Sequence, residues 1–248
     1  MKLILVGCEY VGKKTLAVAI SKWLINSMGL DFLRWHNHFV VPKLDTHMLI
    51  EAVGKTVSVG KHLEDINNDA DEKQIMSLRP AVLEQLQRHN IWRHLHHKLF
   101  KNADVMFINH YYADAVYAPI YYNYGERGSF ADRISRAREW DSELLEIAPD
   151  VVLVLVKASA DIIRKRLKEN CLSNNILQSE DVDKILTDFQ QQYDDPLIPR
   201  KFVLDAIRMS IEEMLEQFKI KIRPYLTKSD NCRMISERSS FLKGELLN

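Results

Sequence analysis

The residues with the clearest chemistry lie close to the start of the chain, between Gly7 and Thr15. The segment Gly7-Cys8-Glu9-Tyr10-Val11-Gly12-Lys13-Lys14-Thr15 fits the spacing G-x-x-x-x-G-K, with its hydroxyl residue one position later than the usual pattern. Glycines allow the backbone to wrap around phosphate oxygens, and a helix N-terminus adds its positive dipole end. Lysine supplies a charge that can follow a phosphoryl group as it moves. The segment therefore predicts a phosphate-binding loop, called the phosphate loop below.

We expect this loop to contact the phosphates of a nucleotide through residues within it and at its end: Gly7, Tyr10, Val11, Gly12, Lys13, Lys14, Thr15 and Leu16. An ordinary turn between a strand and a helix is the alternative, but such a turn seldom needs two glycines and a lysine at this spacing. A second triplet, Gly54-Lys55-Thr56, does not qualify because Leu49 stands where the first glycine should be.

The elements that must position the loop alternate along residues 1–226. Strands are predicted at residues 3–6, 32–41, 104–108, 151–156 and 201–205, and helices at 15–28, 80–100, 113–122, 131–147, 161–169, 181–193 and 211–222. Residues 54–77 are polar and are predicted to be the least ordered internal stretch. The alternation predicts an α/β fold of three layers with a five-stranded, mainly parallel sheet. A TIM barrel requires more strands than these.

The amino-acid composition limits the kinds of binding partner that we expect for this domain. The chain has 248 residues, and its 34 Lys+Arg balance 34 Asp+Glu, so no basic excess favours nucleic acid as a partner. No apolar run approaches the roughly 18 residues of a membrane-spanning helix. Three widely spaced cysteines favour a reducing compartment over a disulfide framework. We therefore expect a cytoplasmic protein without nucleic-acid or membrane partners, and we leave a homodimer open.

The phosphate loop resembles that of the P-loop nucleoside and nucleoside-monophosphate kinases, whose relatives include thymidylate kinase and the deoxynucleoside kinases. Some members place a residue without a hydroxyl directly after the lysine and Thr next, as Lys13-Lys14-Thr15 does. The resemblance covers about residues 1–226, mostly through the order and spacing of elements, and leaves residues 227–248 as a polar C-terminal tail. It implies a P-loop NTPase fold with strand order 2-3-1-4-5, ATP as donor, and Mg²⁺ held by Thr15, water and phosphates.

Three further segments look similar to this family, and one of them, residues 201–222, resembles the family's last strand and helix. Asn109-His110-Tyr111, with Asp114 and Tyr117, stands where thymidylate kinases carry Asp-Arg-Tyr, although Asn109-His110 replaces the Asp-Arg. Arg164-Lys165-Arg166 resembles the arginine-bearing helix of the family's lid, placed here at about residues 160–200. This resemblance implies that Lys13, Arg164 and Arg166 stabilise charge during transfer. A solvated helix face is the alternative for the two arginines.

The acceptor is expected beyond the carboxyl ends of the strands, because ligands of open α/β sheets bind there. We predict His36, His38, Arg88, His110 and Tyr111 as acceptor-binding residues. A zinc site formed by the histidines is disfavoured because no cysteine pair supports one.

A general base is needed only for a hydroxyl acceptor, because a phosphate acceptor is already a nucleophile. Asp114 is the first candidate, Glu9 the second and Asp45 the third. The sequence thus predicts ATP-dependent phosphoryl transfer to a small molecule, with a nucleoside or nucleotide favoured as acceptor. Two alternatives remain: a P-loop sulfotransferase, and a nucleotide-binding protein without turnover, to which Asn109-His110 points.

Overall fold

The computed structural model describes residues 1–37, 51–54, 69–100, 103–129, 131–169, 176–206 and 209–245. Five residues named from the sequence lie outside these ranges, namely His38, Asp45, Leu49, Lys55 and Thr56, as do residues 38–41 of the second predicted strand. In the part of the chain that is described, no helix is both long and apolar enough to cross a membrane.

Within the described ranges, the sheet contains six strands in the order β3-β2-β4-β1-β5-β6. Five are parallel: β1 (Lys2–Val6), β2 (Phe32–Asn37), β4 (Val105–Ile108), β5 (Val152–Lys157) and β6 (Lys201–Asp205). Numbered among themselves, these five have the order 2-3-1-4-5, so the three-layer fold with a five-stranded parallel sheet is confirmed. The sixth strand, β3 (Glu51–Gly54), pairs antiparallel with β2 and was not predicted. Four residues are too few to show a periodic pattern.

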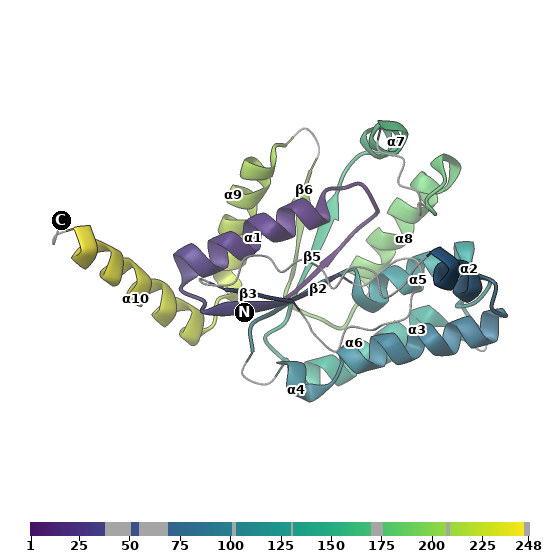
Figure 1. Ribbon diagram of the computed structural model, residues 1–248, viewed down its shortest axis with the longest axis horizontal. Helices are drawn as coiled ribbons and strands as arrows, with labels where there is room; N and C mark the ends of the chain where they lie inside the picture. Colours follow the sequence, from purple (N-terminus) through teal and green to yellow (C-terminus); the bar gives the residue numbers. More distant parts are fainter. Residues whose placement is uncertain are drawn as a thin grey trace.

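Helices cover both faces of the sheet. Figure 1 shows α1 (Lys13–Met28), α9 (Ile211–Ile222) and α10 (Lys228–Glu245) on one side. The other side carries α3 (Pro80–His94), α5 (His110–Tyr121), α6 (Arg133–Ile147) and α8 (Val182–Asp194). The short α7 (Ala160–Glu169) follows β5 and contacts α8. This arrangement places every parallel strand between two helical layers.

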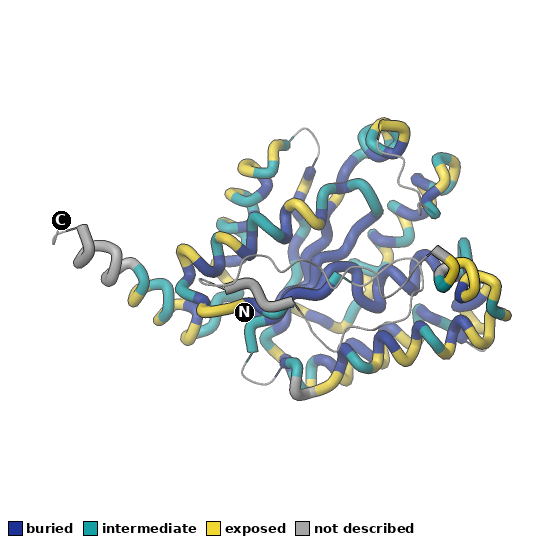
Figure 2. The backbone as a smooth tube through the Cα atoms, in the orientation of Figure 1, coloured by how far each residue is buried: buried dark blue, intermediate teal, exposed yellow. Residues whose placement is uncertain are grey.

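The core lies along the central strands, which Figure 2 shows as continuously buried. Leu3, Ile4 and Leu5 of β1 are fully buried, as are Leu153 and Val154 of β5. A central parallel strand is covered on both faces, so its residues are apolar without alternation. This rigid centre fixes the position of the loops that follow β1 and β4.

Several helices differ from the sequence prediction. The predicted helix over residues 80–100 is divided into α3 and α4 (His97–Phe100), because the chain leaves the helical conformation at Leu95 and His96. The stretch expected to be least ordered contains α2 (Asp69–Met76). Two single 3₁₀ turns, at Ser179–Asp181 and Arg223–Tyr225, precede α8 and α10.

The C-terminal residues, expected as a polar tail, form α10, which packs on α1 through its first turns. Asp230 is buried there and accepts hydrogen bonds from Thr227 Oγ1 (2.7 Å) and Arg233 (2.6 Å). Arg233 also pairs with Asp104, just before β4, at 2.8 Å. Burial raises the pKa of Asp230, but the nearby amino terminus, Thr227 and Arg233 lower it further, so its pKa lies below the ordinary value. A polar pattern can therefore dock through ion pairs that hydrophobic periodicity does not reveal.

Candidate functional site: the phosphate loop and its surroundings

The phosphate loop joins the end of β1 to the start of α1. Gly7 has a φ of 147°, and a Cβ on it would lie 2.4 Å from the carbonyl oxygen of Val156. Gly12 has a φ of 96° and is the N-cap of α1, where no side chain caps the first amides. Tyr10 also has positive φ, at 64°, which a residue with a side chain rarely adopts. The loop therefore keeps a constrained backbone whose helix N-terminus can accept an anion.

Lys13 lies within this loop and not on the surface. Its side chain is 6% exposed, and Nζ donates 2.6 Å hydrogen bonds to the carbonyl oxygens of Gly7 and Cys8. Lys14 and Thr15 are exposed on the first turn of α1, whereas Val11 and Leu16 are buried beneath it. The predicted loop residues are thus brought together, with an ammonium inside the loop and an open hydroxyl beside it. This donor set fits a nucleotide's phosphates, and Thr15 fits a Mg²⁺ ligand.

Helix α5 supports the loop from below. The hydroxyl of Tyr117 accepts a 3.1 Å hydrogen bond from the backbone amide of Glu9 and lies 3.9 Å from Cys8 Sγ. Burial raises the pKa of the Cys8 thiol to about 12 and that of Tyr117 well above its ordinary value. Both groups are therefore neutral near pH 7, so Cys8 is a packing residue and not a nucleophile.

Asn109 and His110 connect β4 to α5 in a strained conformation. Both have positive φ, 68° and 48°, although neither is glycine. The Asn109 amide donates to the carbonyl of Leu5 in β1 at 2.8 Å, and its side-chain Nδ2 donates to Glu9 Oε1 at 3.3 Å. Strain of this kind persists only where the surroundings hold it, and it clusters at functional sites. The turn therefore links the end of β4 directly to the phosphate loop.

Asp114, the first candidate for a general base, already forms an ion pair and a hydrogen bond with other side chains. Its carboxylate pairs with Arg133 Nε at 2.5 Å and accepts a 2.9 Å hydrogen bond from Tyr124. Arg133 in turn pairs with Glu84 at 2.9 Å, and the three charged side chains are at most 6% exposed. Both oxygens of Asp114 are occupied and shielded from water, so this geometry suits a structural carboxylate and not a base that must reach a substrate.

The predicted acceptor residues divide into a buried group and a surface group. His36, 6% exposed, stacks on His94 with ring centroids 3.9 Å apart, and His94 lies 6.5 Å from His110. His110 is fully buried and packs 4.7 Å from the ring of Tyr111. Arg88, by contrast, is 45% exposed with Nε 3.4 Å from Glu84. Among the described residues, no group of His, Cys, Asp and Glu is arranged to hold a metal.

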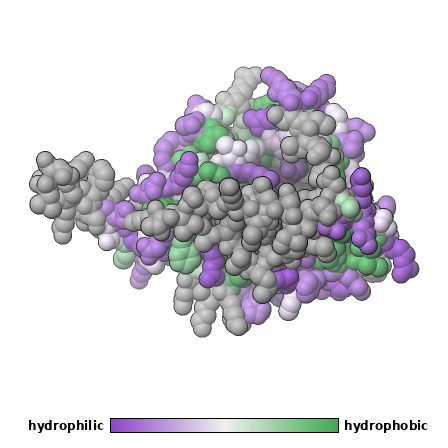
Figure 3. All heavy atoms as spheres, viewed as in Figure 1, coloured by the Kyte–Doolittle hydropathy of each residue, from purple (hydrophilic) through white to green (hydrophobic). Residues whose placement is uncertain are grey.

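The two predicted lid arginines lie in different surroundings. Arg166 Nη1 donates to the carbonyl of Tyr10 in the phosphate loop at 2.8 Å. Arg164 pairs instead with Asp183 of α8 and donates to the carbonyl of Ser179 at 3.1 Å. Figure 3 shows the hydrophilic surface that α7 presents at the top of the view. Arg166 therefore contacts the phosphate loop, whereas Arg164 connects α7 to α8.

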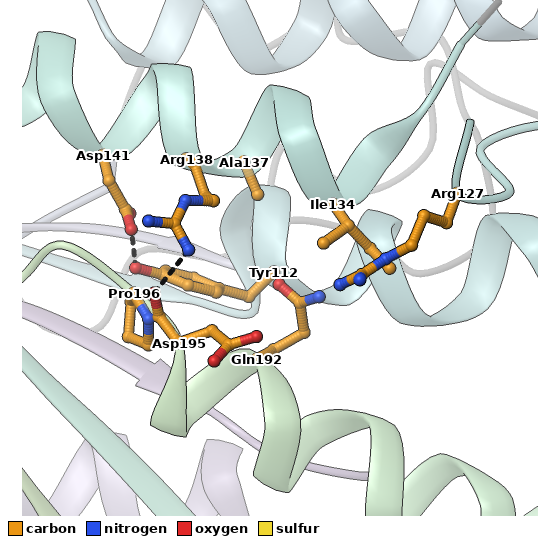
Figure 4. A pocket seen from close by; sticks show the side chains of 9 residues that line it. All are labelled: Tyr112, Arg127, Ile134, Ala137, Arg138, Asp141, Gln192, Asp195 and Pro196. Atoms are coloured by element: carbon orange, nitrogen blue, oxygen red, sulfur yellow. Dashed lines mark hydrogen bonds between the residues drawn. The ribbon is translucent and has the colours of Figure 1, made fainter. Parts of the chain in front are cut away.

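Tyr111 belongs to a second buried network, on the side of α5 that faces α6. Its hydroxyl and that of Tyr112 each donate a 2.6 Å hydrogen bond to Asp141, which is 1% exposed. Burial raises the pKa of Asp141 above the ordinary value. Figure 4 shows Tyr112 and Asp141 beside Arg138, whose guanidinium lies 3.5 Å from the carbonyl of Asp195. The pocket between them measures about 30 Å³, room for a water molecule and not for a nucleotide.

Sequence reasoning missed the residues that hold the site together. Glu84 was not predicted, no pairing with Asp114 was assigned to Arg133, and Tyr117 was named only within a motif. Their roles come from contacts between residues far apart in the chain, for which spacing gives no signal. One signal in the sequence could have indicated such ion pairs: a charged residue at a position that the helical pattern buries. Such a residue is almost never fully buried unless it is paired.

Comparisons with known proteins agree with this architecture. Neither a protein-family model nor a curated protein sequence matches the chain. Among solved structures, deoxyadenosine kinase from M. mycoides with bound dCTP is similar with a TM-score of 0.54 and 15% identity, over 90% of this chain and 100% of that one. The same enzyme with dCMP and dCDP gives a TM-score of 0.52 at the same identity and coverage. Thymidylate kinase from Candida albicans gives 0.53 and 13%, over 92% of this chain and 93% of that one. The chain therefore has the fold of the P-loop nucleoside and nucleotide kinases.

Proposed function

We propose that this protein is a kinase that transfers the γ-phosphoryl group of ATP to a nucleoside or nucleotide. The observation that carries the proposal is the phosphate loop: Lys13 Nζ lies inside it, and Arg166 of α7 reaches the carbonyl of Tyr10 at its rim. Two cations that both contact one loop suit the charge that develops in phosphoryl transfer. The kinase fold supports the same reaction.

In this proposal each group of the loop has a defined task. Backbone amides of the loop and of the first turn of α1 hold phosphate oxygens, and Lys13 exchanges its bonds to Gly7 and Cys8 for bonds to phosphate. Arg166 follows the transferred charge. Thr15 would hold Mg²⁺, which neutralises phosphate charge when bound. We also propose that the protein is located in the cytoplasm.

The decisive experiment is release of ADP by the purified protein across a panel of nucleosides and nucleoside monophosphates, with Lys13→Ala as the negative control. We expect ADP with at least one acceptor and at least a roughly 100-fold loss in the variant. Binding of ATP without ADP from any acceptor would instead support a non-catalytic nucleotide-binding protein. Selective binding of a 3′-phosphorylated adenosine sulfonate donor would support a sulfotransferase.

A further inference from the structure

Helix α7 brings Arg166 to the phosphate loop, although the helix itself is weakly packed. In this ten-residue helix, which the structure describes completely, Ile163 and Leu167 are the buried side chains. Figure 1 shows α7 beside α8, at the edge of the molecule. A segment with few buried apolar contacts opens at a low cost in free energy. The place of Arg166 therefore depends on the polar contacts that hold α7.

One set of these contacts leads from α7 to the start of α8. Arg164 pairs with Asp183 and donates a 3.1 Å hydrogen bond to the carbonyl oxygen of Ser179. Both partners belong to residues 178–183, called segment 178–183 below, which comprise a 3₁₀ turn and the first residues of α8. The position of α7 is therefore set by how firmly segment 178–183 is itself held.

Tyr121, the last residue of α5, holds segment 178–183 from the side opposite the chain of α7. Its hydroxyl donates a 2.9 Å hydrogen bond to Asp181 Oδ2 and accepts a 3.2 Å hydrogen bond from the backbone amide of Gln178. Burial raises the pKa of Tyr121 above its ordinary value, so the hydroxyl keeps the proton that it donates. One hydroxyl thus fixes two residues of the segment that are three positions apart.

The ring of Tyr121 connects the same segment to the phosphate loop. It stacks on Tyr117, four residues earlier on the same side of α5, with ring centroids 6.1 Å apart and an interplanar angle of 21°. The Tyr117 hydroxyl accepts a 3.1 Å hydrogen bond from the backbone amide of Glu9. Arg166 donates to the carbonyl of the next residue, Tyr10. The contacts therefore form a closed path from the loop through α7, segment 178–183 and α5 back to the loop.

From this path, and resting on the proposed kinase function, we infer that Tyr121 is a positioning residue for phosphoryl transfer. It acts through segment 178–183 and Arg164, and it sets α7 so that Arg166 meets the phosphate loop. A displacement of about 1 Å from the productive geometry can cost as much as roughly 100-fold in rate. The hydrogen bonds behind Arg166 therefore affect turnover, although Tyr121 is not itself a catalytic residue.

The first test is Tyr121→Phe, which removes the hydroxyl and keeps the ring that stacks on Tyr117. We expect hydrogen–deuterium exchange in α7 and segment 178–183 to become about 3–10-fold faster, and kcat for ADP release to fall about 3–10-fold, because one or two hydrogen bonds are lost. Tyr225→Phe is the matched control: its hydroxyl, also partly buried, donates to the carbonyl of Lys201 at 3.0 Å, and its loss should change neither quantity. Wild-type exchange in α7, or wild-type kcat, in Tyr121→Phe would overturn the inference.

A double-mutant cycle separates positioning from a general loss of structure. In the Arg166→Ala background, Tyr121→Phe should have no further effect on kcat, because the arginine that it positions is absent. Additive losses of kcat would exclude action through Arg166 and overturn the inference.

Binding gives a readout that does not require turnover. ADP with aluminium fluoride mimics the transferring phosphoryl group, which Arg166 contacts in the proposed function. Tyr121→Phe should weaken binding of this mimic about 3–10-fold and leave the Kd for ADP alone unchanged. Equal weakening of both would mean that Tyr121 shapes the whole nucleotide site, which would also overturn the inference.

The activity of the wild-type protein keeps this inference distinct from the proposed kinase function. ADP release that is equal in wild type and Tyr121→Phe would overturn the role of Tyr121 and leave the kinase function standing. No ADP from wild type with any acceptor would overturn the kinase function and, with it, the role of Tyr121 in transfer, even if α7 exchanged faster in the variant.

Discussion

Substitution of Arg133 by methionine tests the account of the buried charge cluster most directly. The Arg133 side chain is 1% exposed, with Nε 2.5 Å from Asp114 and Nη1 2.9 Å from Glu84. Its guanidinium also lies 5.1 Å from the ring centroid of Tyr124. Methionine fills much of the same volume but leaves Asp114, also 1% exposed, without a counter-charge. Glu84 keeps Arg88 at 3.4 Å, so one carboxylate bears most of the penalty.

The expected loss follows from that geometry. Removing one partner of a buried ion pair costs roughly 3–5 kcal/mol, and we expect about 4 kcal/mol for Arg133→Met. For a chain of this size that corresponds to a fall in melting temperature of roughly 8–16 °C. Differential scanning calorimetry and urea unfolding followed by circular dichroism measure the two quantities. Adding Asp114→Asn should recover part of the loss because it removes the stranded charge.

Arg136→Met is the matched control, on the same helix. Arg136 pairs with Glu139, and the two side chains are 44% and 56% exposed. Water and salt screen such a pair, so its loss should cost less than about 1 kcal/mol. If the free energy of unfolding of Arg133→Met lay within about 1 kcal/mol of the wild-type value, or were reduced no more than that of Arg136→Met, the interpretation of Asp114 as a structural, charge-paired carboxylate would be refuted.

Three further predictions concern the loop, the lid helix and a helix cap. Lys13→Ala should reduce turnover at least about 100-fold with an unchanged melting temperature. Lys14→Ala, on the exposed side of α1, should reduce turnover less than about tenfold. Equal losses of turnover in the two variants would contradict the loop geometry. Arg166→Ala should lower kcat about 10–100-fold, whereas Arg164→Ala should mainly increase proteolysis between α7 and α8, as limited chymotrypsin digestion would show by cleavage after the leucines of this segment. At Asp132, burial raises the pKa, but hydrogen bonds from the backbone amide of Gly128 and from the first turn of α6 lower it further, to below the ordinary 3.8. Its stabilisation is therefore present above that pH and lost as the pH falls through the lower, folded-state pKa. Replacing it by alanine should cost about 1 kcal/mol at pH 7 and much less at pH 2, and a pH-independent cost would contradict this reasoning.

The sequence was sufficient to predict those elements whose structure depends on residues close together in the chain. The phosphate loop could be predicted because its requirements are contiguous: positive φ at Gly12, close approach at Gly7, and an ammonium at Lys13. The parallel strands could be predicted because burial on both faces leaves uninterrupted apolar runs. The strand order came from the resemblance, and the pairing register confirms it.

Other features depend on partners that the sequence does not indicate. Arg164 and Arg166 are two residues apart on one helix, yet one bonds to α8 and the other to the phosphate loop. Residues two apart point to nearly opposite sides of a helix, and only packing decides which neighbour each side chain meets. Strand β3 was likewise missed, because the stability of so short a strand comes from pairing with β2.

The sequence by itself determined that this protein has a phosphate loop on a parallel α/β sheet, since glycine conformation, lysine charge and apolar runs act within a few residues. Tertiary structure alone decided which carboxylate serves which purpose. Asp114 follows β4 as a base might, but Arg133 and Glu84 enclose it, while Asn109 anchors Glu9 beside Lys13 and leaves its side chain 33% exposed. The physical reason is that the work a carboxylate can do depends on its solvent access and its counter-charges, and distant segments of the chain supply both.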